Sequence, residues 1–185
     1  MGQSDIPLNA TGQLQAQRLA ERFAEFSGLC LCSDLSRARD TARALAKNNS
    51  GLQILEDVRL REIAFGKLEG TTPSQWPVLF PAESRAYQAD PLHAVPPGGE
   101  SRQQLMDRVE SFVHDLLQRP EDHFLIVTHG GTLAALFNLL LGWETRQPLP
   151  GFQRLFRFDN SSVTAVEFND PRWRVLLTNC TRHLL

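Results

Sequence analysis

Hydrophobic and polar residues alternate along the chain with two different periods, which predict helices interleaved with short strands. Apolar residues at helical spacing predict amphipathic helices over residues 11–26, after Ser101 and after His129. A further helix is predicted over residues 37–46, after a run of cap and turn residues. Short apolar runs bounded by turn residues predict strands at residues 29–32, 53–55, 124–128, 156–158, 163–168 and 173–177.

The order of these elements predicts the fold class. Strands and helices alternate through the first two thirds of the chain, which favours an α/β fold with a mostly parallel sheet and helices on both faces. The last two strands flank turn residues 169–171 and predict a hairpin, so an antiparallel edge is expected. A length of 185 residues predicts one domain over residues 1–185.

Residues 124–128 form an apolar run that predicts a buried strand, and this run leads directly into His129, Gly130 and Gly131. The apolar helix begins directly after these glycines, so the imidazole is expected at the carboxyl end of a strand and beside a helix N-terminus. Open α/β sheets bind ligands at that edge, and the free N–H groups of a helix start favour an anion. His129 is therefore a candidate functional residue, whereas a histidine elsewhere would more often be a surface or core residue.

A second strand-to-helix turn points to the same edge of the sheet. Residues 29–32 form a strand candidate, the next four residues supply turn chemistry, and Arg37 lies in the first turn of the following helix. The helix dipole disfavours a cation there unless an anion is bound nearby. A solvated arginine is the alternative, but Arg37 and His129 at the ends of two strands together predict an oxyanion pocket.

Composition narrows the class of partner. Hydrophobic residues make up 42% of the chain and the formal net charge is −2, so nothing favours nucleic acid or a membrane surface. Residues 1–5 lack the basic and apolar regions of a signal peptide, and we expect a cytoplasmic protein. Cys30 and Cys32 lie two apart on a strand, so they are expected on one face as buried, reduced thiols.

The segment from residue 71 to 99 breaks the pattern. It holds six of the eleven prolines, together with Trp76, Phe80 and Tyr87. This segment is too long for an ordinary connection and too aromatic for a disordered linker. A structured lid or substrate-facing insert and a rim that packs on the sheet edge both remain open for residues 71–99.

The motifs that are absent leave one kind of chemistry. The sequence contains no cysteine-phosphatase loop, no Walker or dinucleotide loop, no G-x-S-x-G and no histidine pair at metal-ligand spacing. We therefore expect no metal and no cofactor, and a reaction carried by arginine, histidine and a carboxylic acid. Glu62, which follows a strand, is the candidate proton donor and Glu69 competes with it. An ion pair of either glutamate, with Arg59 or Arg61 for instance, is the structural alternative.

Several motifs stand in a fixed order along nearly the whole chain. They are Asp5-Ile6-Pro7-Leu8-Asn9 with Gly12 and Gln15-Ala16, Ser33-Asp34-Leu35-Ser36-Arg37-Ala38 with Thr41-Ala42, Leu60-Arg61-Glu62 with Gly66 and Glu69-Gly70, Pro97-Gly98-Gly99-Glu100-Ser101 with Arg108, Thr128-His129-Gly130-Gly131, and Asn160-Ser161-Ser162-Val163 with residues 179–184. Together they resemble the histidine phosphatase superfamily, the phosphoglycerate-mutase-like group, and within it broad-specificity and α-ribazole phosphatases.

The resemblance implies a three-layer α/β/α sandwich and a role for each matching residue. Arg37 would clamp the phosphate, His129 would donate to the phosphate oxygens together with Gly130, and Glu62 would protonate the leaving group. Members of this family hydrolyse phosphomonoesters or move phosphate between hydroxyls through a phosphohistidine. The expected partner is a small phosphorylated metabolite. The sequence does not settle the oligomeric state, and a homodimer is one option.

The resemblance also implies an Arg-His-Gly motif on a central first strand, which carries the nucleophilic histidine. No such motif occurs in this sequence. We expect the nucleophile to lie upstream of Met1, on a strand missing from the sequence; a pseudoenzyme that binds phosphorylated ligands and a non-catalytic interaction domain are the alternatives. A phosphatase is preferred over a mutase because the insert before Pro97 is short and would leave the pocket open to water.

Overall fold

The computed structural model describes residues 2–140, 156, 158–169 and 172–185. Its centre is a parallel sheet in which β1 (Leu29–Cys32) lies between β2 (Gln53–Glu56) and β3 (Phe124–Val127). All residues of β1 are buried, as expected for an interior strand covered on both faces. The parallel α/β sheet predicted from the alternation of elements is therefore confirmed.

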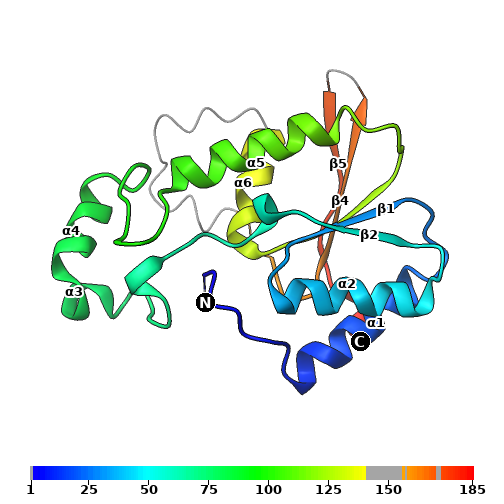
Figure 1. Cartoon of the computed structure of the whole chain (residues 1–185), viewed down its shortest axis with the longest axis horizontal. Coiled ribbons are helices and arrows are strands. Elements are labelled where there is room, and N and C mark those ends of the chain that lie inside the picture. The colour runs from blue at the N-terminus through cyan, green and yellow to red at the C-terminus, as the bar shows by residue number, and fades with distance from the viewer. Residues whose placement is uncertain (1, 141–155, 157, 170–171) are drawn as a thin grey trace.

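Helices cover both faces of this sheet and make three layers (Figure 1). On one side lie α1 (Ala10–Arg22) and α2 (Ser36–Asn48), and on the other lie α5 (Arg102–Leu116) and α6 (Gly130–Leu140). The alternation of side chains along β1 divides the core accordingly. Its leucines pack in the cluster that holds α5 and α6, and its cysteines pack in the cluster that holds α1 and α2.

Cys30 and Cys32 thus share one face, as their spacing predicted. Burial raises the pKa of Cys30 to about 12, and burial followed by the nearby carboxylate of Glu56 raises the pKa of Cys32 to about 11. A thiol with such a pKa stays protonated near neutral pH and is a poor nucleophile. Both cysteines act as small apolar core residues.

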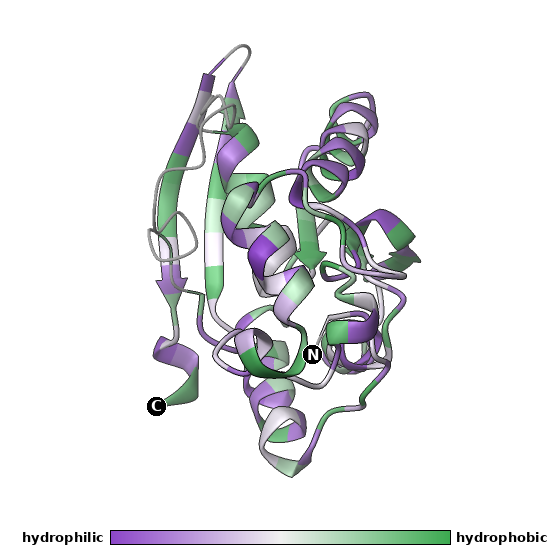
Figure 2. Ribbon diagram, turned by 90° about the vertical axis from the view of Figure 1, so that its left-hand side faces the viewer, coloured by the Kyte–Doolittle hydropathy of each residue, from purple (hydrophilic) through white to green (hydrophobic). Residues whose placement is uncertain are grey.

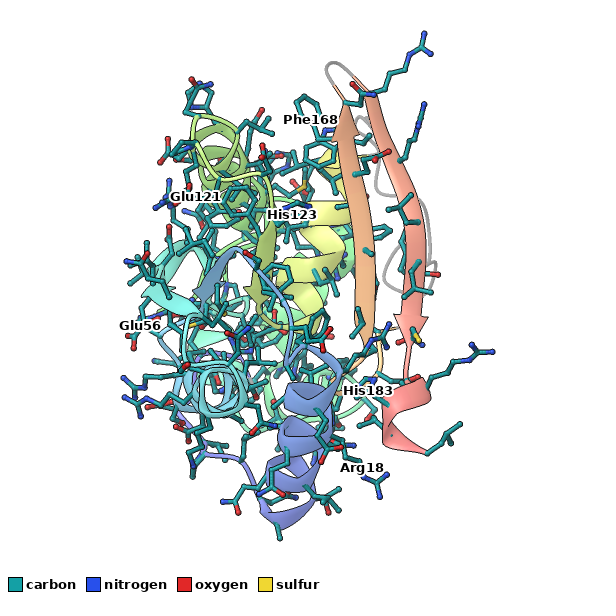
Figure 3. The ribbon with its side chains drawn as sticks, turned by 90° about the vertical axis from the view of Figure 1, so that its right-hand side faces the viewer. Arg18, Glu56, Glu121, His123, Phe168 and His183 are labelled. Atoms are coloured by element: carbon teal, nitrogen blue, oxygen red, sulfur yellow. The ribbon has the colours of Figure 1, made fainter. Side chains whose placement is uncertain are left out.

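The last two strands form a separate antiparallel sheet, with β4 (Val163–Asn169) paired to β5 (Arg172–Cys180). The predicted hairpin is confirmed, although its turn residues 170–171 lie outside the described residues. Within the described residues β3 pairs only with β1, and β4 pairs only with β5. Figure 3 shows that β3, which follows His123, and β4, which carries Phe168, run in opposite directions.

The hairpin has one apolar and one polar face at its far end. The cross-strand pairs Val166 with Val175 and Phe168 with Trp173 lie on one face, while the pairs that alternate with them at this end are Glu167 with Arg174 and Asn169 with Arg172. Figure 2 shows the same alternation of hydrophobic and hydrophilic positions along the two strands. Three of these four apolar residues remain 36–42% exposed, so this face is only partly covered by the described chain.

Some element boundaries predicted from local sequence signals agree with the structure, and others do not. The capping box predicted at Ser101 is present, with Gln104 and Ser101 each accepting a backbone N–H of the other. The first helix ends at Arg22 and not at residue 26, because Phe23 leaves helical geometry and stacks edge-on against Phe26. Phe156 and Phe158 are not in a strand, but pack on Phe137 of α6. Residue 157, between them, lies outside the described residues.

The segment 71–99 folds into two short helices, α3 (Trp76–Leu79) and α4 (Pro81–Ala89). The buried Trp76 packs edge-on against Tyr87 of the same segment and against Phe65, which precedes it. Figure 1 shows these helices extending away from the sheet at one end of the molecule. The segment is therefore structured. Short 3-10 helices complete the chain at Val58–Leu60, Gly66–Leu68 and Arg182–Leu184.

Candidate functional site

His129 lies at the carboxyl end of β3, where α6 begins. Its carbonyl accepts the N–H of Leu133 at 2.8 Å, so it stands just before the first turn of the helix. Its Nε2 is buried and has no hydrogen-bond partner among the described residues. Burial, followed by the positive charges of Arg37 and Arg108, lowers the pKa of His129 to about 4. Arg37 follows β1 and His129 follows its parallel neighbour β3, so both lie at the same edge of the sheet, and Arg108 of α5 is near enough for its charge to act on the imidazole.

Arg37 lies in the first turn of α2, and backbone carbonyls of the N-terminal segment hold its guanidinium. Its Nη1 donates to the carbonyl of Ser4 at 2.9 Å and its Nη2 to the carbonyl of Gly2 at 2.7 Å. The anion at the start of α2 comes from the chain itself, because the carboxylate of Asp5 accepts the N–H of Ser36 at 2.7 Å. This bond lowers the pKa of Asp5 and compensates the helix dipole near Arg37.

Glu62 lies beside the start of α6. One oxygen, Oε1, accepts the N–H of Ile63 at 2.8 Å, and Oε2 accepts the N–H of Gly131 at 3.0 Å. A Cβ atom at position 131 would stand 2.3 Å from Glu62 Oε1, so only glycine permits this approach. The Glu62 carboxylate that packs on Gly131 thus explains why glycine stands at this position, two residues after His129.

The ion pairs that the sequence offered for Glu62 do not form. Arg59 pairs with Asp115 at 2.6 Å and with Asp57, and Arg61 pairs with Asp34 at 2.5 Å. Among the described residues, neither arginine forms a hydrogen bond or an ion pair with the Glu62 carboxylate. The carboxylate is therefore held by backbone amides and remains beside the site.

Glu69, the alternative candidate for the proton donor, binds the N-terminal segment of the chain. Its carboxylate accepts the N–H groups of Gln3 and Ser4 at 2.7 and 3.0 Å, the hydroxyl of Ser4 at 2.6 Å, and the N–H of Phe65 at 3.2 Å. Burial alone would raise the pKa of Glu69, but these hydrogen bonds outweigh it and lower the pKa. Glu69 anchors the N-terminal segment as a carboxylate.

Gly130 leaves room beside the imidazole. It is exposed, and a Cβ atom built at this position would meet nothing within 4 Å. It is the first residue of α6, where backbone N–H groups have no partner within the helix. Gly130 thus leaves open space at the start of α6.

Sequence reasoning assigned no role to three charged residues of the site. Arg108 reaches from α5 to the segment that carries Glu62, and its charge lowers the pKa of His129. Asp34 and Arg61 form a two-bond ion pair between the loop after β1 and that same segment. All three positions carried a signal as members of motifs, but the pairing of Asp34 with Arg61 joins residues far apart in sequence and could not be read from the motifs.

The low pKa of His129 gives a pH dependence of stability. An unfolded chain takes up this proton near pH 6.5 and the folded chain only near pH 4, so acid favours unfolding between these values. We expect the free energy of unfolding to fall by about 3 kcal/mol across this window because of His129. Denaturant unfolding at several pH values measures it. A His129→Gln variant should lose this part of the pH slope, whereas His123→Gln, at an exposed site, should keep it.

Comparison with known proteins assigns the class to which this fold and site belong. The chain belongs to the histidine phosphatase superfamily (branch 1), whose sequence pattern matches residues 1–181. The resemblance of its ordered motifs is therefore confirmed. Within the described residues no helix has the length and apolar character needed to cross a membrane, and no three His, Cys, Asp or Glu residues could hold a metal ion.

Individual relatives include both mutases and phosphatases. A probable phosphoglycerate mutase, GpmB, of Enterobacter sp. (strain 638) is 34% identical over 180 residues, which cover 93% of this chain and 78% of the relative. The α-ribazole phosphatase of Shigella flexneri matches with a TM-score of 0.84 and 30% identity, over 97% of this chain and 87% of its own. A mycobacterial glucosyl-3-phosphoglycerate phosphatase with inorganic phosphate matches with a TM-score of 0.78 and 31% identity, over 99% and 92%.

Proposed function

We propose that the protein is a metal-independent phosphomonoester hydrolase that acts through a phosphohistidine. The observation that carries this proposal is the convergence of His129, Arg37 and Arg108 at one sheet edge, with the Glu62 carboxylate on the adjoining helix start. A phosphoryl group in transfer spreads negative charge over three oxygens, and the two guanidinium groups together with the imidazole as a hydrogen-bond donor would meet that charge without a metal. Arg37, His129 and Gly130 bind the phosphate in this proposal.

Glu62 is the proton donor to the leaving oxygen. Its carboxylate lies beside the start of α6, close to the open space at Gly130. It accepts two backbone N–H groups, which hold the carboxyl group at this place.

The nucleophilic histidine lies upstream of Met1 in this proposal. The carbonyl of Gly2 rests on Arg37, and the side-chain amide of Gln3 donates to the carbonyl of Glu62 at 2.9 Å. A chain that continues before Gly2 therefore departs from the rim of the site. It could present a residue to a phosphate held by Arg37 and His129. Sequencing the transcript upstream of Met1 tests this placement, and an in-frame stop codon directly before Met1 would contradict it.

The substrate class is a small phosphorylated metabolite in a cytoplasmic setting. The similar phosphatases are named for α-ribazole phosphate and for glucosyl-3-phosphoglycerate, which differ widely in the group that carries the phosphate. We propose the segment 71–99 as the lid or substrate-facing insert that selects this group. A mutase is the second candidate, because curated relatives at up to 34% identity are named probable phosphoglycerate mutases. A pseudoenzyme is the third, because this sequence contains no Arg-His-Gly motif.

One assay separates these candidates. The protein is prepared with its upstream segment and supplied with 3-phosphoglycerate and, separately, with α-ribazole phosphate. We expect released inorganic phosphate to exceed isomerised phosphoglycerate, because the short insert leaves the phosphorylated intermediate open to water. Dominant isomerisation would establish the mutase. No turnover of any phosphomonoester in a broad panel, with phosphate binding retained, would establish the pseudoenzyme.

A further inference from the structure

The segment that carries Glu62 is held in an unusual way. Residues 59–62 pass from a 3-10 helix into irregular backbone, yet all four of their carbonyls accept hydrogen bonds from side chains. Three side chains reach all four carbonyls: Arg108 Nη1 to Arg59 O at 2.5 Å, Thr128 Oγ1 to Leu60 O at 2.8 Å, Thr132 Oγ1 to Arg61 O at 2.6 Å, and Arg108 Nη2 to Glu62 O at 3.1 Å. The side-chain amide of Gln3 gives Glu62 O a second bond at 2.9 Å. Side-chain hydrogen bonds therefore hold the backbone at each of residues 59–62.

The three donors all surround His129. Thr128 is its neighbour in sequence, Thr132 lies in the first turn of α6, and Arg108 is close enough for its charge to affect the imidazole. Thr132 is fully buried, so its hydroxyl has no water to bond in place of the Arg61 carbonyl. The same turn that positions the imidazole thus also holds the backbone on which Glu62 stands.

We propose that Thr128, Thr132 and Arg108 form a carbonyl clamp, whose task is to fix Glu62 at the start of α6 beside His129. These are positioning residues, because each acts on the Glu62 carboxylate through the backbone of residues 59–62. The role in catalysis rests on the function proposed above; the clamp itself is a property of the fold.

Arg108 is the most constrained member of the clamp. Its Nε and Nη2 donate to the carboxylate of Glu100 at 3.0 and 2.7 Å, and both side chains are largely buried. Glu100 also accepts the N–H of Ala64 at 2.9 Å, on the far side of Glu62. Arg108 and its partner Glu100 therefore bind the backbone both before and after Glu62. A fixed guanidinium fork suits this task, since its two Nη atoms reach the carbonyls of Arg59 and Glu62 at once.

Geometry explains why such a device matters. A proton donor must lie within hydrogen-bond reach of the leaving oxygen, and a misplacement of about 1 Å can cost on the order of 10²-fold in rate. Glu62 gains no such precision from secondary structure, because it stands in neither a helix nor a strand. The clamp supplies it and ties the donor to the same turn that carries His129.

The clamp is tested in the chain as it is, by the NMR signal of the Gly131 amide, which donates to Glu62. In the unaltered protein, the pH titration of the Glu62 carboxyl should displace this signal. Thr132→Val removes the hydroxyl, and we expect the displacement to be lost. Thr132→Ser should restore it. Thr41→Val is the matched control, because it deletes a hydroxyl-to-carbonyl bond of 2.9 Å within α2 and should leave the Gly131 signal unchanged.

An unchanged Gly131 titration in folded Thr132→Val would overturn the proposal. If that variant does not fold, Thr128→Val is read by the same signal and with the same two outcomes. In the protein with its upstream segment, Thr132→Val should lower kcat about 10- to 100-fold with little change in KM. A protein that never hydrolyses a phosphomonoester, but loses the Gly131 titration on Thr132→Val, would refute the proposed function and leave the clamp standing.

Discussion

Arg37→Ala is expected to lower the affinity of the chain for vanadate or inorganic phosphate by about 100-fold, which effectively abolishes binding. The guanidinium lies in the first turn of α2 and is oriented by the carbonyls of Gly2 and Ser4. Removing one partner of a desolvated charge pair typically costs about 2–5 kcal/mol. Titration calorimetry with vanadate measures the change, and requires no catalytic turnover.

Arg43→Ala provides the control, because Arg43 lies on the same helix with 62% of its side chain exposed and pairs only weakly with Asp40. It should leave the affinity unchanged. Arg37→Lys should recover part of the binding, since it keeps the charge but not the planar fork. If vanadate binds equally well to Arg37→Ala, this guanidinium is not in the pocket and the proposed phosphate site is wrong.

Glu62→Gln is expected to reduce kcat toward alkyl phosphomonoesters by about 10²–10⁴-fold in the protein with its upstream segment. The amide keeps the size of the side chain but has no proton to give to a leaving alkoxide. An aryl ester such as p-nitrophenyl phosphate expels a stable phenolate and should be far less affected. Steady-state rates with both esters, measured side by side, give the comparison.

The role of Glu62 is read from the difference between the loss of kcat with the alkyl ester and the loss with the aryl ester. An equal loss with both would mean that Glu62 shapes the site but does not donate the proton. Glu110→Gln is the matched control, since Glu110 is exposed on α5 and should change neither rate. Vanadate affinity of the Glu62→Gln variant should stay within a few-fold of the unaltered protein, because the carboxylate contacts Gly131 and not Arg37.

Local sequence signals were sufficient for the elements that frame the site. An apolar run followed by two glycines and an apolar helix predicted β3, the turn at His129 and α6, because each of these depends on adjacent residues. The expectation that this strand is buried was wrong, since its residues are only half-buried among the described residues. The capping box at Ser101 is local in the same sense. Parallel order also placed Arg37 and His129 at one edge, since the carboxyl ends of neighbouring parallel strands meet there.

Contacts between distant residues could not be read from the sequence. Nothing in the pattern around Asp5 indicates that it bonds the start of α2, 31 residues away. The same holds for Arg61 and Asp34, and for Glu69, which resembles a catalytic acid by position and serves as an anchor. Each of these depends on how the loops cross in space, which local periodicity does not specify.

The position of β3 at the border of its sheet has a geometric consequence. All four of its residues are only half-buried, in contrast to those of β1. An extended peptide that docked alongside β3 in the same direction would finish level with Val127, so the residue after its end would be delivered to the imidazole. Such a peptide would run opposite in direction to β4.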